Sequence, residues 1–267
     1  MRRRSFLLIL PLLAASGGPA LAGETACWFE NGAVVAPAVL GTIAGDFVID
    51  LSAPRTLLHL DIAQGRGFTE TALTLPVRLA DQRIDAAPVQ VASLDYRAVG
   101  FSTPIIGVIG ADVLDRYVVS LDASPCRLRL DAPGQSLPAP GSPPLAVTVV
   151  GGVATVLAAA SDGRKGVSGP FALDTASDGG VRARGAADGP RQKPAGDLPA
   201  LSFDGQVRQD VPAVVAGELP AGVVGALGMR LLAAYRLRLD APAGRLWLTP
   251  KMEGPGEEKG PGVSAEP

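Results

Sequence analysis

The sequence contains few aromatic residues, only two cysteines and a single histidine among its 267 residues. The lone histidine, His59, makes a serine hydrolase or a metallohydrolase an unattractive interpretation, because these enzymes need further histidine or other ligand residues. The formal net charge is −2, so the chain has no excess of positive charge of the kind that binds nucleic acid or an anionic membrane. We therefore expect no metal, no organic cofactor and no nucleic-acid partner.

Long apolar runs are also lacking after the amino terminus, so we expect no membrane span in the mature chain. Residues 1–22 have the pattern of a signal peptide: a basic start, an apolar stretch too short to span a bilayer, and small residues for cleavage. The arginines at positions 2–4 fit both a Sec signal and a twin-arginine signal. The sequence thus predicts an exported protein, periplasmic or secreted, with the export route left open.

The two cysteines are Cys27 and Cys126. In an exported protein a pair of cysteines is expected to form a disulfide. This bridge would close a loop of about 100 residues and contribute on the order of 4–5 kcal/mol in the chain-entropy model. The alternatives are two buried free thiols and a metal site, which would need more ligands than the chain supplies.

An internal duplication is the most informative feature of the chain. An apolar strand that ends in aspartate occurs twice, at Asp50 and at Asp174, which lie 124 positions apart. From Gly107 and Gly225 onward the offset between the copies is 118. Two constant offsets indicate a duplicated unit in which one loop has changed length. Pairing of the units about a pseudo-twofold axis would bring the two carboxylates together.

Each copy is predicted to consist of short strands, because turn residues separate short apolar runs. We therefore predict an all-β protein with two pseudo-twofold-related β-barrel lobes, each with one short helix. Asp112 and Asp115 of the first helix have no acidic counterparts in the second copy, and we interpret them as ordinary helix surface. Tight hairpins are expected at Asn31-Gly32 and Gly151-Gly152, and further hairpins between residues 75–79 and 88–91 and between residues 201–203 and 211–215.

The two lobes are expected to span residues 24–131 and 145–250. Between them, residues 132–144 form a stiff proline-rich linker. The polar stretch 182–199 is predicted to be a surface loop. Residues 251–267 are rich in glycine, proline and glutamate, which is typical of a disordered tail.

This layout resembles the aspartic proteases, in particular their retropepsin-like and two-lobed pepsin-like branch, over most of residues 27–250. Each lobe of that family carries Asp-Thr-Gly-Ser/Ala after an apolar strand and, later, an apolar-apolar-Gly strand that leads into a short helix. The second signature is matched by Ile105-Ile106-Gly107 and Val223-Val224-Gly225. The first is matched in part, by Asp50-Leu51-Ser52-Ala53 and Asp174-Thr175-Ala176-Ser177.

The resemblance implies an aspartic endopeptidase in which Asp50 and Asp174 face each other in an interlobe cleft that takes a peptide or protein. Two close carboxylates hold one proton between them. The ionised member then takes a proton from the attacking water, and the protonated member supports the oxyanion. This mechanism needs no cofactor, and we expect the protein to act as a monomer.

The turns depart from the family pattern. Ser52 and Ala176 each add a Cβ where the family has glycine, whose absence of a side chain lets backbone amides approach the carboxylates. Leu51 lacks the family's threonine hydroxyl, which Thr175 retains. Ala53 has no hydroxyl for the outer oxygen of its aspartate, whereas Ser177 has one. The hairpin of residues 75–91, the expected substrate flap, carries no tyrosine.

These departures leave two alternatives open. One is a catalytically weak or inactive module of the same fold that binds peptides or proteins outside the cytoplasm. The other is that the two aspartates only cap turns after strands, as aspartate often does.

Overall fold

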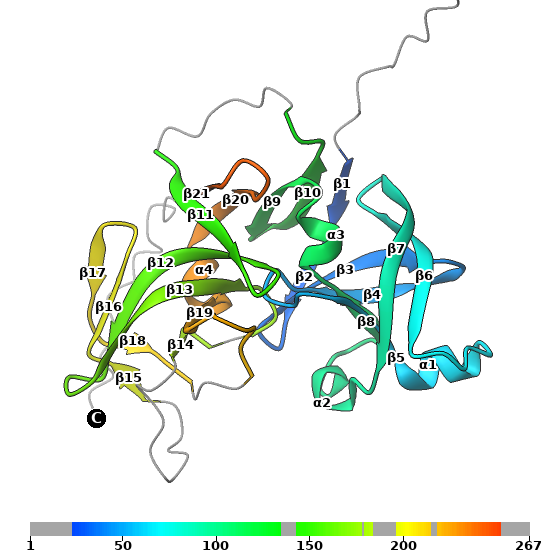
Figure 1. The fold of residues 1–267 in the computed structure, drawn as a ribbon, viewed down its shortest axis with the longest axis horizontal. Helices are drawn as coiled ribbons and strands as arrows, with labels where there is room; N and C mark the ends of the chain where they lie inside the picture. Colours follow the sequence, from blue (N-terminus) through cyan, green and yellow to red (C-terminus); the bar gives the residue numbers. More distant parts are fainter. Residues whose placement is uncertain (1–22, 135–142, 178, 184–195, 215–217, 252–267) are drawn as a thin grey trace, which may run out of the picture.

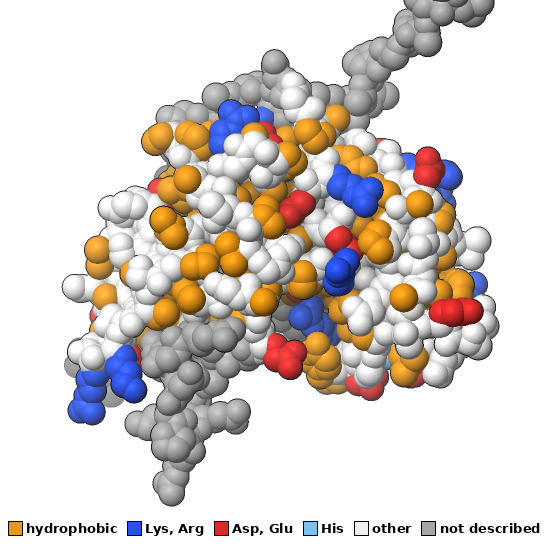
Figure 2. Space-filling model, viewed as in Figure 1, with side chains coloured by type: hydrophobic (Ala, Val, Ile, Leu, Met, Phe, Trp, Pro, Cys, Tyr) orange, Lys and Arg blue, Asp and Glu red, His pale blue; other side chains and the backbone are white. Residues whose placement is uncertain are grey.

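The structure is a computed structural model that describes residues 23–134, 143–177, 179–183, 196–214 and 218–251 (Figure 1). The predicted signal peptide, most of the predicted linker and the predicted tail beyond Lys251 lie outside the described residues. No helix among the described residues is long and apolar enough to cross a membrane. Acidic and basic side chains are interspersed on the face shown in Figure 2, in agreement with the small net charge.

The amino-terminal half forms a closed barrel of six strands. Its strands follow the order β3-β4-β8-β5-β7-β6, and β6 pairs back with β3, so the barrel has no free edge. Phe47, Ile49 and Leu58 fill its core and are almost fully buried. The strands are β2 (Trp28–Glu30), which extends β3, and β3 (Ala33–Leu40), β4 (Ile43–Ile49), β5 (Thr56–His59), β6 (Ala72–Leu79), β7 (Gln82–Ala92) and β8 (Ile105–Ile109).

The carboxyl-terminal half is built on an open sheet. Within it β12, β13, β19 and β14 follow one another, β16 pairs with β12, and β17 pairs with β16. Separately, β15 pairs with β18 in a two-stranded sheet. The strands are β11 (Leu145–Val150), β12 (Val153–Ser161), β13 (Gly166–Asp174), β14 (Val181–Ala183), β15 (Asp197–Leu198), β16 (Ala200–Phe203), β17 (Gln206–Arg208), β18 (Val211–Pro212) and β19 (Gly225–Gly228).

The prediction of a second β-barrel lobe is wrong for the described residues. The strand β11 pairs with β12 on one side and with β21 (Arg245–Pro250) on the other, so this edge continues into a further sheet instead of closing a barrel. The predicted hairpin between residues 201–203 and 211–215 is also different. The turn at Asp204-Gly205 returns the chain at once into β17, because both turn residues have positive φ and fix a two-residue loop.

A central sheet joins the two halves. It runs β1-β10-β9-β20-β21-β11, and β9 and β20, which are equivalent strands of the two copies, pair antiparallel at its middle. Leu121 lies opposite Leu237, and Val119 lies opposite Leu239. The pairing of equivalent strands is what a pseudo-twofold relation requires. The new strands are β1 (Gly23–Ala26), β9 (Val118–Ala123), β10 (Cys126–Asp131), β20 (Tyr235–Asp240) and β21 (Arg245–Pro250).

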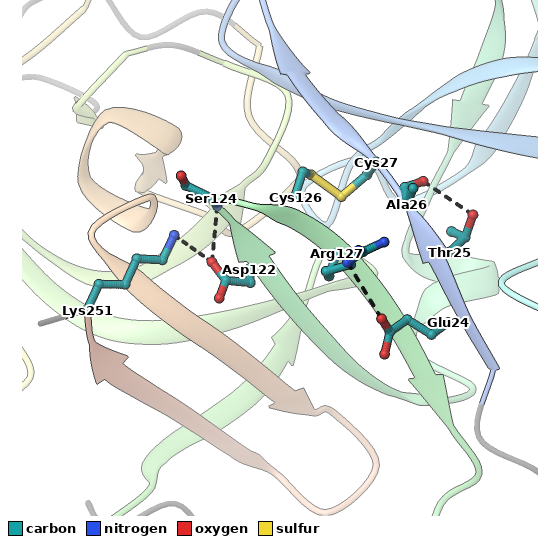
Figure 3. The surroundings of a disulfide bond; sticks show 9 residues. All are labelled: Glu24, Thr25, Ala26, Cys27, Asp122, Ser124, Cys126, Arg127 and Lys251. Atoms are coloured by element: carbon teal, nitrogen blue, oxygen red, sulfur yellow. Dashed lines mark hydrogen bonds and ion pairs between the residues drawn. A yellow bond between two sulfur atoms is a disulfide. The ribbon is translucent and has the colours of Figure 1, made fainter. Parts of the chain in front are cut away.

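Cys27 and Cys126 form a disulfide that ties the barrel to this central sheet (Figure 3). Cys27 lies between β1 and β2, and Cys126 is the first residue of β10. The bridge closes a long loop, with a sequence separation of 99 residues, and so removes much of the chain entropy of the unfolded state. It fixes the first strands of the chain against the sheet that carries both halves.

In the part of the chain that the structure describes, four short helices connect the strands: α1 (Leu60–Gly65), α2 (Asp95–Ala98), α3 (Ala111–Leu114) and α4 (Met229–Leu232). The helices α3 and α4 are the expected pair, one per copy. The prediction of a single helix per lobe is wrong for the amino-terminal half, which also has α1 and α2. The helix α1 directly follows His59, whose Nδ1 accepts a hydrogen bond from the Asp61 N–H and so caps the helix.

Candidate active site

Asp50 and Asp174 occupy equivalent places in the two halves. Asp50 follows β4, which runs parallel to β8, and Asp174 ends β13, which runs parallel to β19. The Asp50 N–H donates to the carbonyl of Ile109 over 3.0 Å, so the ladder of β8 fixes the end of the strand. Both aspartates are buried, with 1% and 2% of their surface exposed. Buried carboxylates at strand ends need partners, and the surrounding turns provide them.

Thr175 joins the two aspartate turns. Its hydroxyl donates to the carbonyl of Ile49 over 2.6 Å and accepts from the Leu51 N–H over 3.0 Å. Its own carbonyl accepts a hydrogen bond from the Val34 N–H over 2.9 Å. Because Thr175 is fully buried, these three hydrogen bonds hold the turns of Asp50 and Asp174 in one register. Leu51 contributes only its backbone N–H. The side chain that bridges the two turns therefore comes from the carboxyl-terminal half alone.

The two carboxylates interact electrostatically. Burial raises the pKa of Asp174, and the negative charge of Asp50 raises it further. The guanidinium of Arg182, the Ala176 N–H and the guanidinium of Arg97 act in the opposite direction, and the pKa of Asp174 remains above its ordinary value. The neutral form of Asp174 is therefore favoured, and the pair retains a proton over a wider pH range than an isolated aspartate.

The side chains at positions 52 and 176 do not keep the backbone amides away from the carboxylates. The Ser52 N–H and the Ser52 hydroxyl both donate to Asp50 Oδ1, over 2.8 and 2.7 Å. The Ala176 N–H donates to Asp174 Oδ1 over 3.1 Å. The expected loss of amide contacts is therefore wrong, and Ser52 adds a hydroxyl donor of its own.

The other two turn residues, Ala53 and Ser177, make hydrogen bonds to the backbone of their own halves. Ala53 is buried, and its carbonyl accepts from the Ala111 N–H at the start of α3 over 2.8 Å. The Ser177 hydroxyl accepts from the Gly179 N–H over 3.2 Å. The hydrogen bonds to Asp174 that the structure describes come from Ala176 and Arg182. The resemblance implied a hydrogen bond from the Ser177 hydroxyl to the outer oxygen of Asp174, and the described hydrogen bonds do not include it.

Two arginines, Arg97 and Arg182, contact the outer oxygens of the pair. Arg97 Nη1 of α2 donates to Asp50 Oδ2 over 2.8 Å. Arg182 Nη2 of β14 donates to Asp174 Oδ2. Neither arginine was predicted from the sequence to contact the aspartates. Position 182 was expected in a surface loop, but β14 pairs with β19 and places Arg182 opposite Ala226, beside the end of β13.

The helix that carries Arg97 is tied to the barrel. His59 Nε2 lies 3.3 Å from Asp95 Oδ1, and Asp95 is the first residue of α2. His59, Asp61 and Asp95 each have a possible ligand atom within 4.8 Å of the others. Both ring nitrogens of His59 already have partners, however, the Asp61 N–H and the Asp95 carboxylate. His59 is thus a satisfied, buried residue that positions α1 and α2.

A second pair of carboxylates lies outside the candidate active site. Asp112 of α3 and Asp115, which directly follows this helix, line a hollow that also includes the Gly151-Gly152 turn of the other half. Burial raises the pKa of Asp115 to about 7, with a further contribution from the charge of Asp112. One oxygen of each carboxylate is buried without a hydrogen-bond partner. The interpretation of these residues as ordinary helix surface is therefore wrong.

Among solved structures, the chain is similar to the crystal structure of an aspartic proteinase from Irpex lacteus. The TM-score is 0.53 at 14% sequence identity, and the match covers 87% of this chain and 98% of that chain. Neither a model of a known protein family nor a curated protein matches the sequence. At this identity the similarity shows a shared pepsin-like fold.

Proposed function

We propose that the protein is an aspartic-type endopeptidase that acts outside the cytoplasm and uses Asp50 and Asp174 to activate water. The observation that carries this proposal is the Thr175 bridge, which joins the turns of the two buried aspartates. The raised pKa of Asp174 supports it, because a dyad needs one protonated member. The disulfide agrees with an exported protein, since such bonds persist in oxidising compartments.

The hydrogen bonds assign a role to each aspartate. Asp50 accepts from Ser52 twice and from Arg97, which suits an ionised carboxylate that takes a proton from the attacking water. Asp174, favoured in its neutral form, gives its proton to the carbonyl oxygen as the tetrahedral diol forms. In the second step Asp50 passes its new proton to the leaving amine, and Asp174 takes a proton back from the diol. Both carboxyl groups return to their starting states.

A second candidate function is a peptide-binding module of the same fold with little or no catalysis. The ion pairs of Arg97 and Arg182 favour it, because a guanidinium at each outer oxygen stabilises the ionised form of both aspartates. If both aspartates are ionised at the working pH, no member of the pair holds the proton that the reaction requires.

Digestion of a peptide library by the purified protein between about pH 3 and 7 separates these functions, because a shared-proton pair works only while one member is charged. We expect cleavage that disappears in Asp50→Asn and in Asp174→Asn. Asp122→Asn is the matched control, because Asp122 also pairs with an arginine, Arg236, but lies in the central sheet. Cleavage that survives both dyad substitutions removes the pair from the mechanism, and peptide binding without cleavage favours the binding module.

A further inference from the structure

The guanidinium groups of Arg97 and Arg182 have hydrogen-bonding capacity beyond the two aspartates. A guanidinium carries five N–H donors and can hold a carboxylate with two of them. Each arginine contacts its aspartate through one Nη atom. Arg97 Nε donates to the Tyr96 hydroxyl over 3.2 Å, and Arg182 Nε is buried without a hydrogen-bond partner. Each arginine therefore has donors for a second anionic group while it keeps its aspartate.

The charge balance of the site favours such a group. Two guanidinium groups face two carboxylates, and the raised pKa of Asp174 leaves that carboxyl neutral over part of the pH range. With one proton on the pair, the four side chains carry a net charge of about +1. An excess positive charge in a mostly buried site is unfavourable unless an anion accompanies it.

One of the two arginines is also accessible to a ligand. The Arg97 side chain is 32% exposed, while its partner Asp50 is 1% exposed, so solvent reaches the guanidinium where the carboxylate is covered. The neighbouring residues of the same segment, Tyr96 and Val99, are 75% and 77% exposed and offer apolar surface beside it. Arg182 is more enclosed, at 19%.

We propose that Arg97 and Arg182 recognise a carboxylate of the bound peptide, so that the site prefers acidic peptides over neutral ones. This inference rests on the proposed function, since it concerns the peptide that the aspartate pair acts on or binds. The carboxylate comes either from an acidic side chain near the aspartates or from the carboxyl terminus of the peptide. Both sources present the same planar group, which matches the guanidinium fork.

Four fluorescent octapeptides distinguish the sources: a central glutamate or a matched glutamine, each with a free or an amidated carboxyl terminus. Binding is measured by anisotropy at about pH 6, where glutamate is ionised, with reduced peptide bonds to prevent cleavage. We expect the peptides with the recognised carboxylate to bind about tenfold to a hundredfold more tightly, the range of charge-assisted hydrogen bonds. A preference that follows the glutamate identifies an internal acidic residue, and one that follows the free terminus identifies the chain end.

The variants Arg97→Gln and Arg182→Gln should each reduce this preference several-fold. Arg97→Lys should retain part of this preference, because lysine keeps the positive charge but lacks the paired N–H donors of the planar guanidinium. Arg236→Gln, which removes the exposed partner of Asp122 in the central sheet, should leave it unchanged. Circular dichroism shows whether each variant is folded, and the lysine variant keeps the test valid if the glutamine variant unfolds.

Equal affinity for all four peptides in the wild-type protein overturns the inference and leaves the proposed function standing. Tighter binding of all four peptides to Arg97→Gln also overturns it, because the arginine then only blocks the site. If none of the four peptides binds and the library is not cleaved, both the inference and the proposed function fail.

Discussion

The hydroxyl of Thr175 donates to the carbonyl of Ile49 and accepts from the N–H of Leu51, so one side chain from the second half closes the aspartate turn of the first. The contact links positions that are more than 120 residues apart in the chain. It gives the relative placement of Asp50 and Asp174 a specific structural cause, and it can be tested by removing a single oxygen atom.

Thr175→Val should destabilise the protein and abolish any activity that depends on the dyad. The substitution leaves the Leu51 N–H and the Ile49 carbonyl buried without their partner, which costs on the order of 1–3 kcal/mol. Thr175→Ser keeps the hydroxyl and should retain most of the activity. Denaturant unfolding and peptide cleavage measure both effects. Equal behaviour of the valine and serine variants would contradict a hydrogen-bonding role.

Ser52→Gly restores the residue that the aspartic protease family has at this position, yet we expect it to lower activity. The Ser52 N–H already reaches Asp50 Oδ1, so glycine adds no donor, and the hydroxyl contact at 2.7 Å is lost. Ser52→Ala loses the same hydroxyl and keeps the Cβ. The two variants should therefore fall in kcat to a similar extent, by up to about tenfold to a hundredfold. A glycine variant faster than wild type would show that the Cβ of Ser52 limits catalysis.

Arg182→Gln should move the alkaline limb of the pH–rate profile to higher pH. Arg182 lowers the pKa of Asp174, against the stronger effects of burial and of Asp50, so its removal raises that pKa further. Asp174 then stays protonated to a higher pH, and the reaction that uses its proton continues there. Arg236→Gln serves as the control and should leave the profile in place. A shift of the limb to lower pH would be the opposite of the expected electrostatic effect.

The duplication in the sequence was sufficient to predict that Asp50 and Asp174 are equivalent residues of the two copies. Equal offsets imply equivalent strands, and the structure places Asp50 and Asp174 at the ends of equivalent strands. Arg97 and Arg182 carry no such signal, because neither has an arginine at the corresponding position of the other copy at an offset of 124 or 118. Their contacts with the aspartates arise only from the folded path of α2 and β14.

The form of the second half could not be predicted from local patterns. The strand β11 has the apolar character expected for either sheet, and its pairing with both β12 and β21 decides that the sheet stays open on this side. The position of Asp115 is a similar case. This residue directly follows a helix of four residues, and so short a helix does not reveal from sequence which side faces the junction of the two halves, where the structure places this carboxylate.

Asp115→Asn should stabilise the protein at about pH 8 and have little effect at about pH 4. Burial, together with the charge of Asp112, raises the pKa of Asp115 from 3.8 to about 7 in the folded chain. The folded state therefore binds a proton more tightly than the unfolded state, and stability falls as the pH rises through this window. Asparagine cannot ionise, so it removes this penalty, which is on the order of 1–3 kcal/mol for a buried group without a partner.

The control for this prediction is Asp122→Asn, which should have the opposite effect. Despite partial burial, hydrogen bonds from Lys251, Ser124 and Arg236 hold the pKa of Asp122 below its usual value. Its ionised form therefore stabilises the folded state, and its removal should lower stability most at neutral and higher pH. Thermal unfolding of the wild-type protein and both variants at the two pH values measures these changes. If Asp115→Asn were equally destabilising at both pH values, Asp115 would be a structural hydrogen-bond acceptor, and the assignment of an unpaired carboxylate oxygen beside Gly151-Gly152 would be wrong.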